Sequence, residues 1–174
     1  MKHLIEDNIR YLQQAHDLLS ALPDDIYAAP APARLGSSIG AHLRHCLDHY
    51  DSFINGLNGN AIDYDARQRN PNLETCRTTA LAKLETTIAA LESASSQADR
   101  SLRVKMDCGG EPDAAEVWTQ SSARRELQFL ISHTVHHYAI IKMILTAGGR
   151  EATPDFGIAP STLRYHQGAT PCAH

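Results

Sequence analysis

Histidines recur at helical spacing in two apolar segments that lie far apart in the sequence. The first segment carries His42, His45 and His49, and the second carries His133 and His137. Residues three or four positions apart lie on the same face of an α-helix, about one turn from each other. Two imidazoles at this spacing can reach one metal ion. The sequence therefore predicts two histidine-bearing helices that face each other and either share a metal or fill a core.

Four long helices are predicted from the apolar pattern. Apolar residues recur at intervals of three, four and seven, as expected for helices that bury one face. The expected ranges are residues 2–22, 37–57, 73–96 and 122–148. Amphipathic helices of this number and length favour an all-α fold, specifically a four-helix bundle.

Capping residues set the expected ends of these helices. Pro23 ends the first helix because proline cannot continue it. Ser37 or Ser38 can cap the start of the second helix, and Ser121 or Ser122 can cap the fourth. The sequence leaves both choices open.

The segments between the helices are expected to be loops, with one short hairpin. Residues 28–33 alternate alanine and proline, so we expect a long crossover loop. Residues 61–71 read as irregular, and residues 102–106 and 115–118 could form a short β-hairpin before the last long helix. The tail, residues 150–174, is apolar enough to pack on the bundle or at a subunit interface. The 174 residues are expected to form one domain.

The composition of the chain excludes several classes of protein. The net charge is -4 and no basic surface is indicated, so we expect no nucleic-acid partner. No apolar stretch is long enough to span a bilayer. The first residues are charged where a signal peptide would be apolar, which favours a cytoplasmic protein. Four cysteines without a C-x-x-C pair favour reduced thiols, with Cys46 and Cys76 as small core residues on helices.

The histidines are expected to point inward. On a helical projection, His42, His45 and His49 share a face with apolar residues of the second helix. Imidazole suits Zn, Ni, Fe or Cu better than Mg or Ca, and three imidazoles leave a coordination position open for chemistry. Asp48 could orient one imidazole or could be an ordinary solvated residue. Histidines that only hydrogen-bond one another within a metal-free core are the simpler alternative.

Three further residues are candidates for the site. Arg67 and Arg69 could bind a carboxylate of a peptide-like cofactor, although ion pairs with Asp63 or Asp65 would explain them as well. Glu126 shares the face of the second histidine pair. It could be a general base or an arginine partner.

The two histidine segments resemble the DinB/YfiT-like superfamily. The resemblance is carried by Ser38-Ile39-Gly40-Ala41-His42-Leu43-Arg44-His45-Cys46-Leu47-Asp48-His49 and by His133-Thr134-Val135-His136-His137-Tyr138-Ala139-Ile140-Ile141. It implies a four-helix bundle with a divalent metal held by three histidines, one from the second helix and two from the last long helix. The family pattern then corresponds to His45, His133 and His137. His49, or less readily His42, could replace His45 or add a fourth ligand.

The resemblance also implies an activity, although less specifically than the metal site. It implies a metal-dependent enzyme with Zn or Ni and a small-molecule substrate. This enzyme would be either a thiol-dependent S-transferase that uses bacillithiol, mycothiol or glutathione, or a hydrolase. The alternative is a non-catalytic bundle that binds metal or another ligand in a stress response. Pairing of helix faces would make a homodimer.

Overall fold

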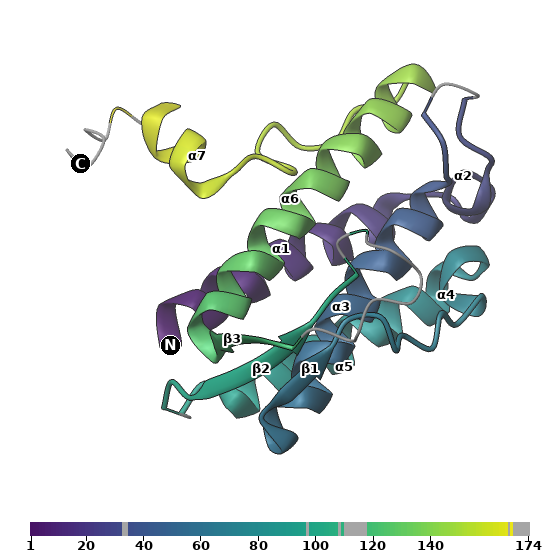
Figure 1. Cartoon of the computed structure of the whole chain (residues 1–174). Helices are drawn as coiled ribbons and strands as arrows, with labels where there is room; N and C mark the ends of the chain where they lie inside the picture. The colour runs from purple at the N-terminus through teal and green to yellow at the C-terminus, as the bar shows by residue number, and fades with distance from the viewer. Residues whose placement is uncertain (33–34, 97, 108, 110–117, 167, 169–174) are drawn as a thin grey trace.

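The structure, a computed structural model, is mostly helical with one small three-stranded sheet (Figure 1). It describes residues 1–32, 35–96, 98–107, 109, 118–166 and 168. In chain order the elements are α1 Lys2–Ala21, α2 Asp24–Ala28, α3 Ile39–Gly59, β1 Ala61–Asp63, α4 Asn72–Thr75, α5 Arg77–Ala94, β2 Ser101–Lys105, β3 Thr119–Ser122, α6 Ala123–Ala147 and α7 Pro160–His166. Within the described ranges, no helix is both long enough and apolar enough to cross a membrane.

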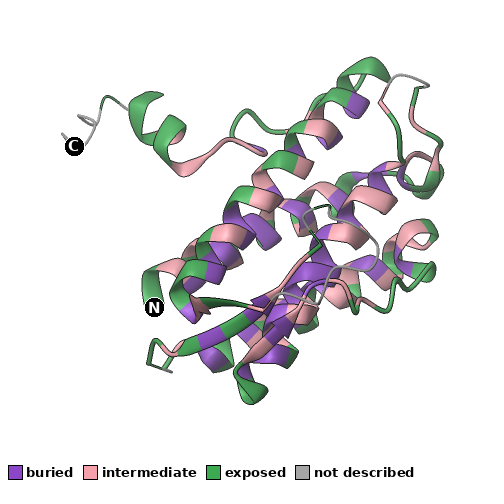
Figure 2. Cartoon of the chain, in the orientation of Figure 1, coloured by how far each residue is buried: buried purple, intermediate pink, exposed green. Residues whose placement is uncertain are grey.

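Four long helices enclose the core. Helices α1 and α3 each pack against both α5 and α6, so every long helix has two long neighbours. The buried side chains lie on the facing sides of these helices (Figure 2). On α1, for example, these are Ile5, Asn8, Tyr11, Leu12, Ala15 and Leu19. The period of three and four residues in the sequence thus identified the buried faces correctly.

The structure decides between the alternative caps. The hydroxyl of Ser38 accepts a hydrogen bond from the amide of Ala41, and the hydroxyl of Ser122 accepts one from Arg125. Each bond satisfies an amide that has no partner within the first turn of a helix. Ser38 and Ser122 are therefore the caps of α3 and α6.

Two helical predictions need correction. The helix expected over residues 73–96 is split into α4 and α5 at Cys76, whose backbone is extended (φ -117°, ψ 103°). Cys76 is half-buried at this break instead of lying in the core, whereas Cys46 is buried as predicted. Helix α2 was not expected, because its five residues are too few to show a helical period.

The hairpin prediction is correct for one strand, and the sheet has a third strand that was not predicted. β2 pairs antiparallel with β3 and parallel with β1. The antiparallel partner of β2 is β3, Thr119–Ser122, which comes later in the chain than the predicted partner, residues 115–118. Of that predicted partner, residues 115–117 lie outside the described residues. β1 falls in the segment predicted to be irregular. Its central residue, Ile62, pairs with Val104 and is buried under the helices.

One part of the tail packs on the long helices, and the other part does not. The ring of Phe156 is buried and stacks on Tyr138 with centroids 4.6 Å apart, and the hydroxyl of Tyr11 donates to the carbonyl of Ile158. Helix α7, which follows, buries none of its residues and points away from the other helices (Figure 1). The segment just before α7, and not α7 itself, covers α6.

A glycine allows α4 to approach α3 closely. A Cβ on Gly40 would lie 2.0 Å from the carbonyl oxygen of Glu74, at the α4 turn. This contact holds the start of α3 against α4, two residues before the first of the histidines. The backbone there cannot accommodate a side chain without moving.

We expect Gly40→Ala to lower the free energy of unfolding by about 1–3 kcal/mol, the usual cost of overpacking. The matched control is Gly59→Ala in the same helix, where an added Cβ meets no atom within 4 Å. Urea denaturation of both variants measures the difference. Equal stability of the two variants would show that the close approach of α4 is not required.

Candidate metal centre

The two histidine faces meet between α3 and α6. Nε2 of His45 lies 3.1 Å from Nε2 of His133, and Nδ1 of His42 lies 3.0 Å from Nδ1 of His137. The two segments lie far apart in the sequence and come together because α3 packs directly on α6. The prediction that the histidine-bearing helices face each other is correct.

Ring nitrogens of three histidines converge on one point. One nitrogen from each of His45, His49 and His133 lies within 4.8 Å of the other two. A tetrahedral zinc ion with Zn–N bonds of about 2.0–2.1 Å would hold its nitrogens about 3.3 Å apart. The 3.1 Å separation in the His45–His133 pair is close to that value.

His137 adjoins the same cluster. Its ring centroid lies 4.6 Å from that of His133 and 4.7 Å from that of His45. The structure therefore gathers all five predicted histidines into one continuous group, with His45 and His133 at its centre. His136 is exposed and packs beside His137.

Hydrogen bonds fix which nitrogen of His49 carries the proton. Its Nδ1 lies 2.9 Å from the backbone carbonyl of His45, and a carbonyl only accepts, so Nδ1 must carry the hydrogen. In the neutral ring Nε2 is then an acceptor. Nη1 of Arg67 donates to it over 3.2 Å.

Other nitrogens of the cluster lack partners among the described residues. Nδ1 of His133 and Nε2 of His42 are buried without a hydrogen bond. In the His45–His133 contact two ring nitrogens face each other, and either a shared proton or a cation must separate their lone pairs. Unsatisfied buried nitrogens of this kind are costly in an ordinary core. The donor set therefore fits a divalent metal ion that prefers imidazole.

The histidines are held in the neutral form that binds metals. Burial is the main cause, and neighbouring imidazoles and Arg67 add to it at several of these rings. These effects lower the pKa of His133 to about 2, of His45 to about 3, and of His49 and His137 to about 4. Burial also lowers the pKa of His42. At neutral pH, protons therefore do not compete for these lone pairs.

Asp48 does not orient an imidazole. Its buried carboxylate lies 2.7 Å from Nη1 of Arg44, and Nε of Arg44 lies 2.8 Å from Glu74. Burial raises the pKa of Asp48, while the hydrogen bond from Arg44 acts in the opposite direction. Arg44 thus pairs with Asp48 on its own helix and joins α3 to α4 through Glu74, so Asp48 has a structural contact beside the cluster.

Among the described residues, Glu126 has two hydroxyl partners and forms no ion pair with an arginine or a histidine. Its buried carboxylate accepts hydrogen bonds from the hydroxyl of Tyr64 at 3.0 Å and from that of Ser121 at 2.5 Å. The ring of Tyr64 stacks on His49 with centroids 5.3 Å apart. Glu126 thus holds the aromatic ring that covers His49.

Two aromatic residues of the site were missed in the sequence. Tyr64 follows β1, and Phe129 on α6 lies 5.3 Å from Tyr64 and 5.5 Å from His133, centroid to centroid. Together they form an apolar wall beside His49 and His133. In the sequence, apolar Ile62 and Tyr64 alternate with Asp63 and Asp65, a pattern of only four residues that was the one signal pointing to Tyr64.

The two candidate arginines have different positions. Arg67 is half-buried and contacts His49, not Asp63 or Asp65 as the ion-pair alternative required. Arg69 is exposed, with a left-handed backbone (φ 48°). Of these two arginines, Arg67 therefore reaches the histidine cluster and Arg69 does not.

The low pKa values make a prediction for the metal-free protein. Between about pH 4 and pH 6.5 the unfolded chain binds protons that the folded histidines refuse, because an unperturbed histidine has a pKa near 6.5. The stability should be fully present above pH 6.5 and should fall as the pH drops through this range. Urea unfolding of chelator-treated protein at pH 7.5, 6 and 5 measures it.

The matched variants for this pH series are His133→Phe and His136→Gln. The first removes a half-buried histidine of the cluster and should reduce the slope of stability against pH, whereas the second changes an exposed one and should leave the slope as it is. A stability that is constant from pH 7.5 to pH 5 would contradict the prediction.

Comparison with known proteins finds one relative and one family with similar sequences. A fungal protein named FK506-binding protein 5, from Rhizopus delemar (strain RA 99-880), is 35% identical over 107 residues. The match covers 60% of this chain but 27% of that protein, so the chain spans about a quarter of the relative's length. No solved structure matches. The family model of the DinB superfamily matches residues 10–141, a range that includes all five clustered histidines, and the chain therefore belongs to the DinB superfamily.

Proposed function

We propose that the protein is a divalent-metal-dependent enzyme that transfers a low-molecular-weight thiol to a small electrophile, on a four-helix bundle of the family type. The observation that carries the proposal is the convergence of His45 on α3 with His133 on α6. Two facing neutral imidazoles from different helices, with no other polar group between them, are the arrangement that a bundle uses to hold a metal.

We assign His45, His133 and His137 as the ligands. His45 and His133 have the closest nitrogens, and His137 lies one turn after His133 with its ring against both. His42 hydrogen-bonds Nδ1 of His137, as residues behind a metal ligand commonly do to fix its ring. Nε2 of His49 already accepts a hydrogen bond from Arg67. We therefore assign His49 as a possible fourth ligand and not as one of the three principal ligands.

The residues around the cluster suit an anionic sulfur ligand. When bound, a Zn or Ni ion would lower the pKa of a thiol so that it is a thiolate at neutral pH. Neutral imidazoles leave the positive charge of such an ion uncompensated, and this favours an anion in the open position. Tyr64 and Phe129 exclude water from one side of the cluster.

A cytoplasmic location and a homodimer remain predictions from the sequence.

Metal analysis of protein purified without an affinity tag tests the ligand set. We expect about one equivalent of metal in the natural protein and its loss in His45→Ala and in His133→Ala, since each removes a central ligand. His136→Ala, on the same helix but exposed, is the matched control and should keep the metal. Full occupancy in His45→Ala would show that the α3 ligand has been assigned wrongly.

Turnover assays test the chemistry. We expect conjugation of monochlorobimane to glutathione, bacillithiol or mycothiol that depends on the metal and is lost in His133→Ala. Hydrolysis of p-nitrophenyl acetate without any thiol would instead indicate a hydrolase. Metal occupancy without either activity would support a non-catalytic binding protein and contradict the proposal.

A further inference from the structure

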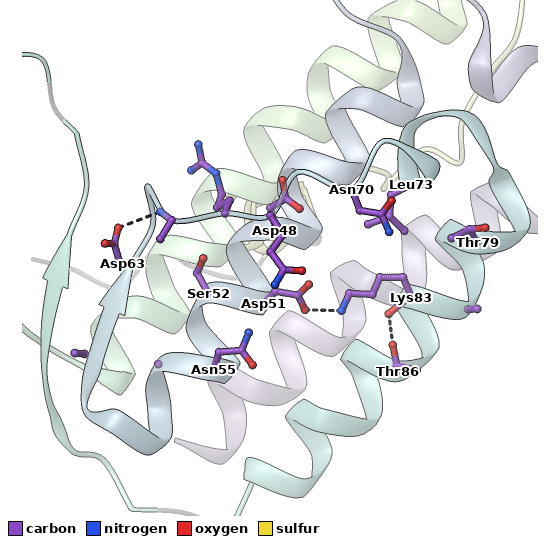
Figure 3. A pocket seen from close by; sticks show the side chains of 16 residues that line it. Asp48, Asp51, Ser52, Asn55, Asp63, Asn70, Leu73, Thr79, Lys83 and Thr86 are labelled. Carbon is purple, nitrogen blue, oxygen red and sulfur yellow. Dashed lines mark hydrogen bonds and ion pairs between the residues drawn. The ribbon is translucent and has the colours of Figure 1, made fainter.

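A polar cavity of about 800 Å³, drawn in Figure 3, is lined in part by Arg67, the residue that contacts His49 of the histidine cluster. It is enclosed by α3, by α5 and by the segment that runs from β1 to α4. Side chains of Ser52, Asn55 and Asn70 offer hydroxyl and amide groups to it. Such a lining suits a small hydrophilic molecule better than an apolar one.

The carboxylates that line this cavity already have cationic partners. The pairs are Asp48 with Arg44 at 2.7 Å, Asp51 with Lys83 at 2.6 Å and Asp63 with Lys105 at 3.5 Å. Arg67 also lines the cavity, and no carboxylate within the described part of the chain pairs with it. Its Nε is buried and has no hydrogen-bond acceptor among the described residues. The cavity therefore has an unmatched guanidinium group.

Arg67 joins the cavity to the metal centre. Its Nη1 donates to Nε2 of His49, the nitrogen that carries the lone pair. A metal ion would need the same lone pair, so Arg67 and a metal cannot both bind this nitrogen. A group that draws Arg67 away from His49 would make that nitrogen available.

We propose that the cavity binds a small monocarboxylate and that Arg67 couples this binding to the metal centre. The carboxylate takes the two parallel hydrogen bonds that a guanidinium offers, and Arg67 leaves His49, whose Nε2 becomes an additional metal ligand. Because Asp48, Asp51 and Asp63 already have cationic partners, Arg67 can balance one negative charge, and a doubly charged anion such as phosphate would keep one charge without a partner. This coupling rests on the proposed metal centre.

Cobalt titration tests the coupling in the natural protein, Arg67→Met and Arg69→Met. Methionine keeps the length of the side chain but cannot donate to His49. We expect Arg67→Met to bind Co²⁺ about tenfold tighter, since a charged hydrogen bond no longer competes for Nε2, and to show a changed visible spectrum as a histidine is added. Arg69→Met removes an equally positive but exposed residue, and it should match the natural protein in both readouts.

The carboxylate is tested with N-acetylglycine at millimolar concentration. In the natural protein it should tighten Co²⁺ binding and shift the spectrum toward that of Arg67→Met, and in Arg67→Met it should change neither. Inorganic phosphate should have no effect on the natural protein.

The outcomes separate the coupling from the metal centre itself. Identical Co²⁺ affinity and spectrum in Arg67→Met and Arg69→Met would overturn the coupling while the metal centre stands. An effect of N-acetylglycine that persists in Arg67→Met would place the carboxylate on the metal and overturn the cavity site. If N-acetylglycine has no effect on the natural protein, the cavity site is overturned as well. If none of the three proteins binds Co²⁺, the metal centre fails and the coupling with it.

Discussion

The contact between half-buried, neutral imidazoles of α3 and α6 is the constraint on which the rest of the structure depends. Placing polar rings in a helix interface is unfavourable unless each nitrogen finds a partner. Some of these nitrogens bond to each other, one bonds to a backbone carbonyl and one to Arg67, and two have no partner among the described residues. The interface thus has more unsatisfied polar atoms than a core of leucines would have, and a metal ion bound to these nitrogens would remove part of that cost.

A second set of polar contacts fixes the position of α3 against α6. Thr134 on α6 donates to the hydroxyl of Tyr50 on α3, and that hydroxyl donates to Asn8 on α1. Asn8 in turn donates to the carbonyl of Leu127 on α6. Because these contacts are buried and directional, they set the axial position of three helices. They therefore support the same alignment in which the histidines of α3 and α6 face each other at about 3 Å.

The sequence predicted what periodicity can show and missed what depends on single contacts. The bounds of α1, α3 and α6 follow from apolar spacing and caps, and the facing histidines follow from spacings of three and four. β1 and α2 are too short to give a period, and the break at Cys76 appears only in the backbone. The partner of Arg67 was also beyond prediction, because nothing in the spacing of residues 67 and 49 indicates that their side chains meet.

The three histidines of α3 have different partners, and this difference explains why one helix carries so many. His45 faces His133 at the centre of the cluster, while the rings on either side of it along α3 bond outward, His42 to His137 and His49 to Arg67. In the ligand set that we propose, the central ring binds the metal and the outer two control its surroundings. One outer ring orients a ligand of α6 and the other connects the centre to the polar cavity. A helix with a histidine at position 45 alone could hold a metal, but it would have no contact through which the cavity could influence that metal.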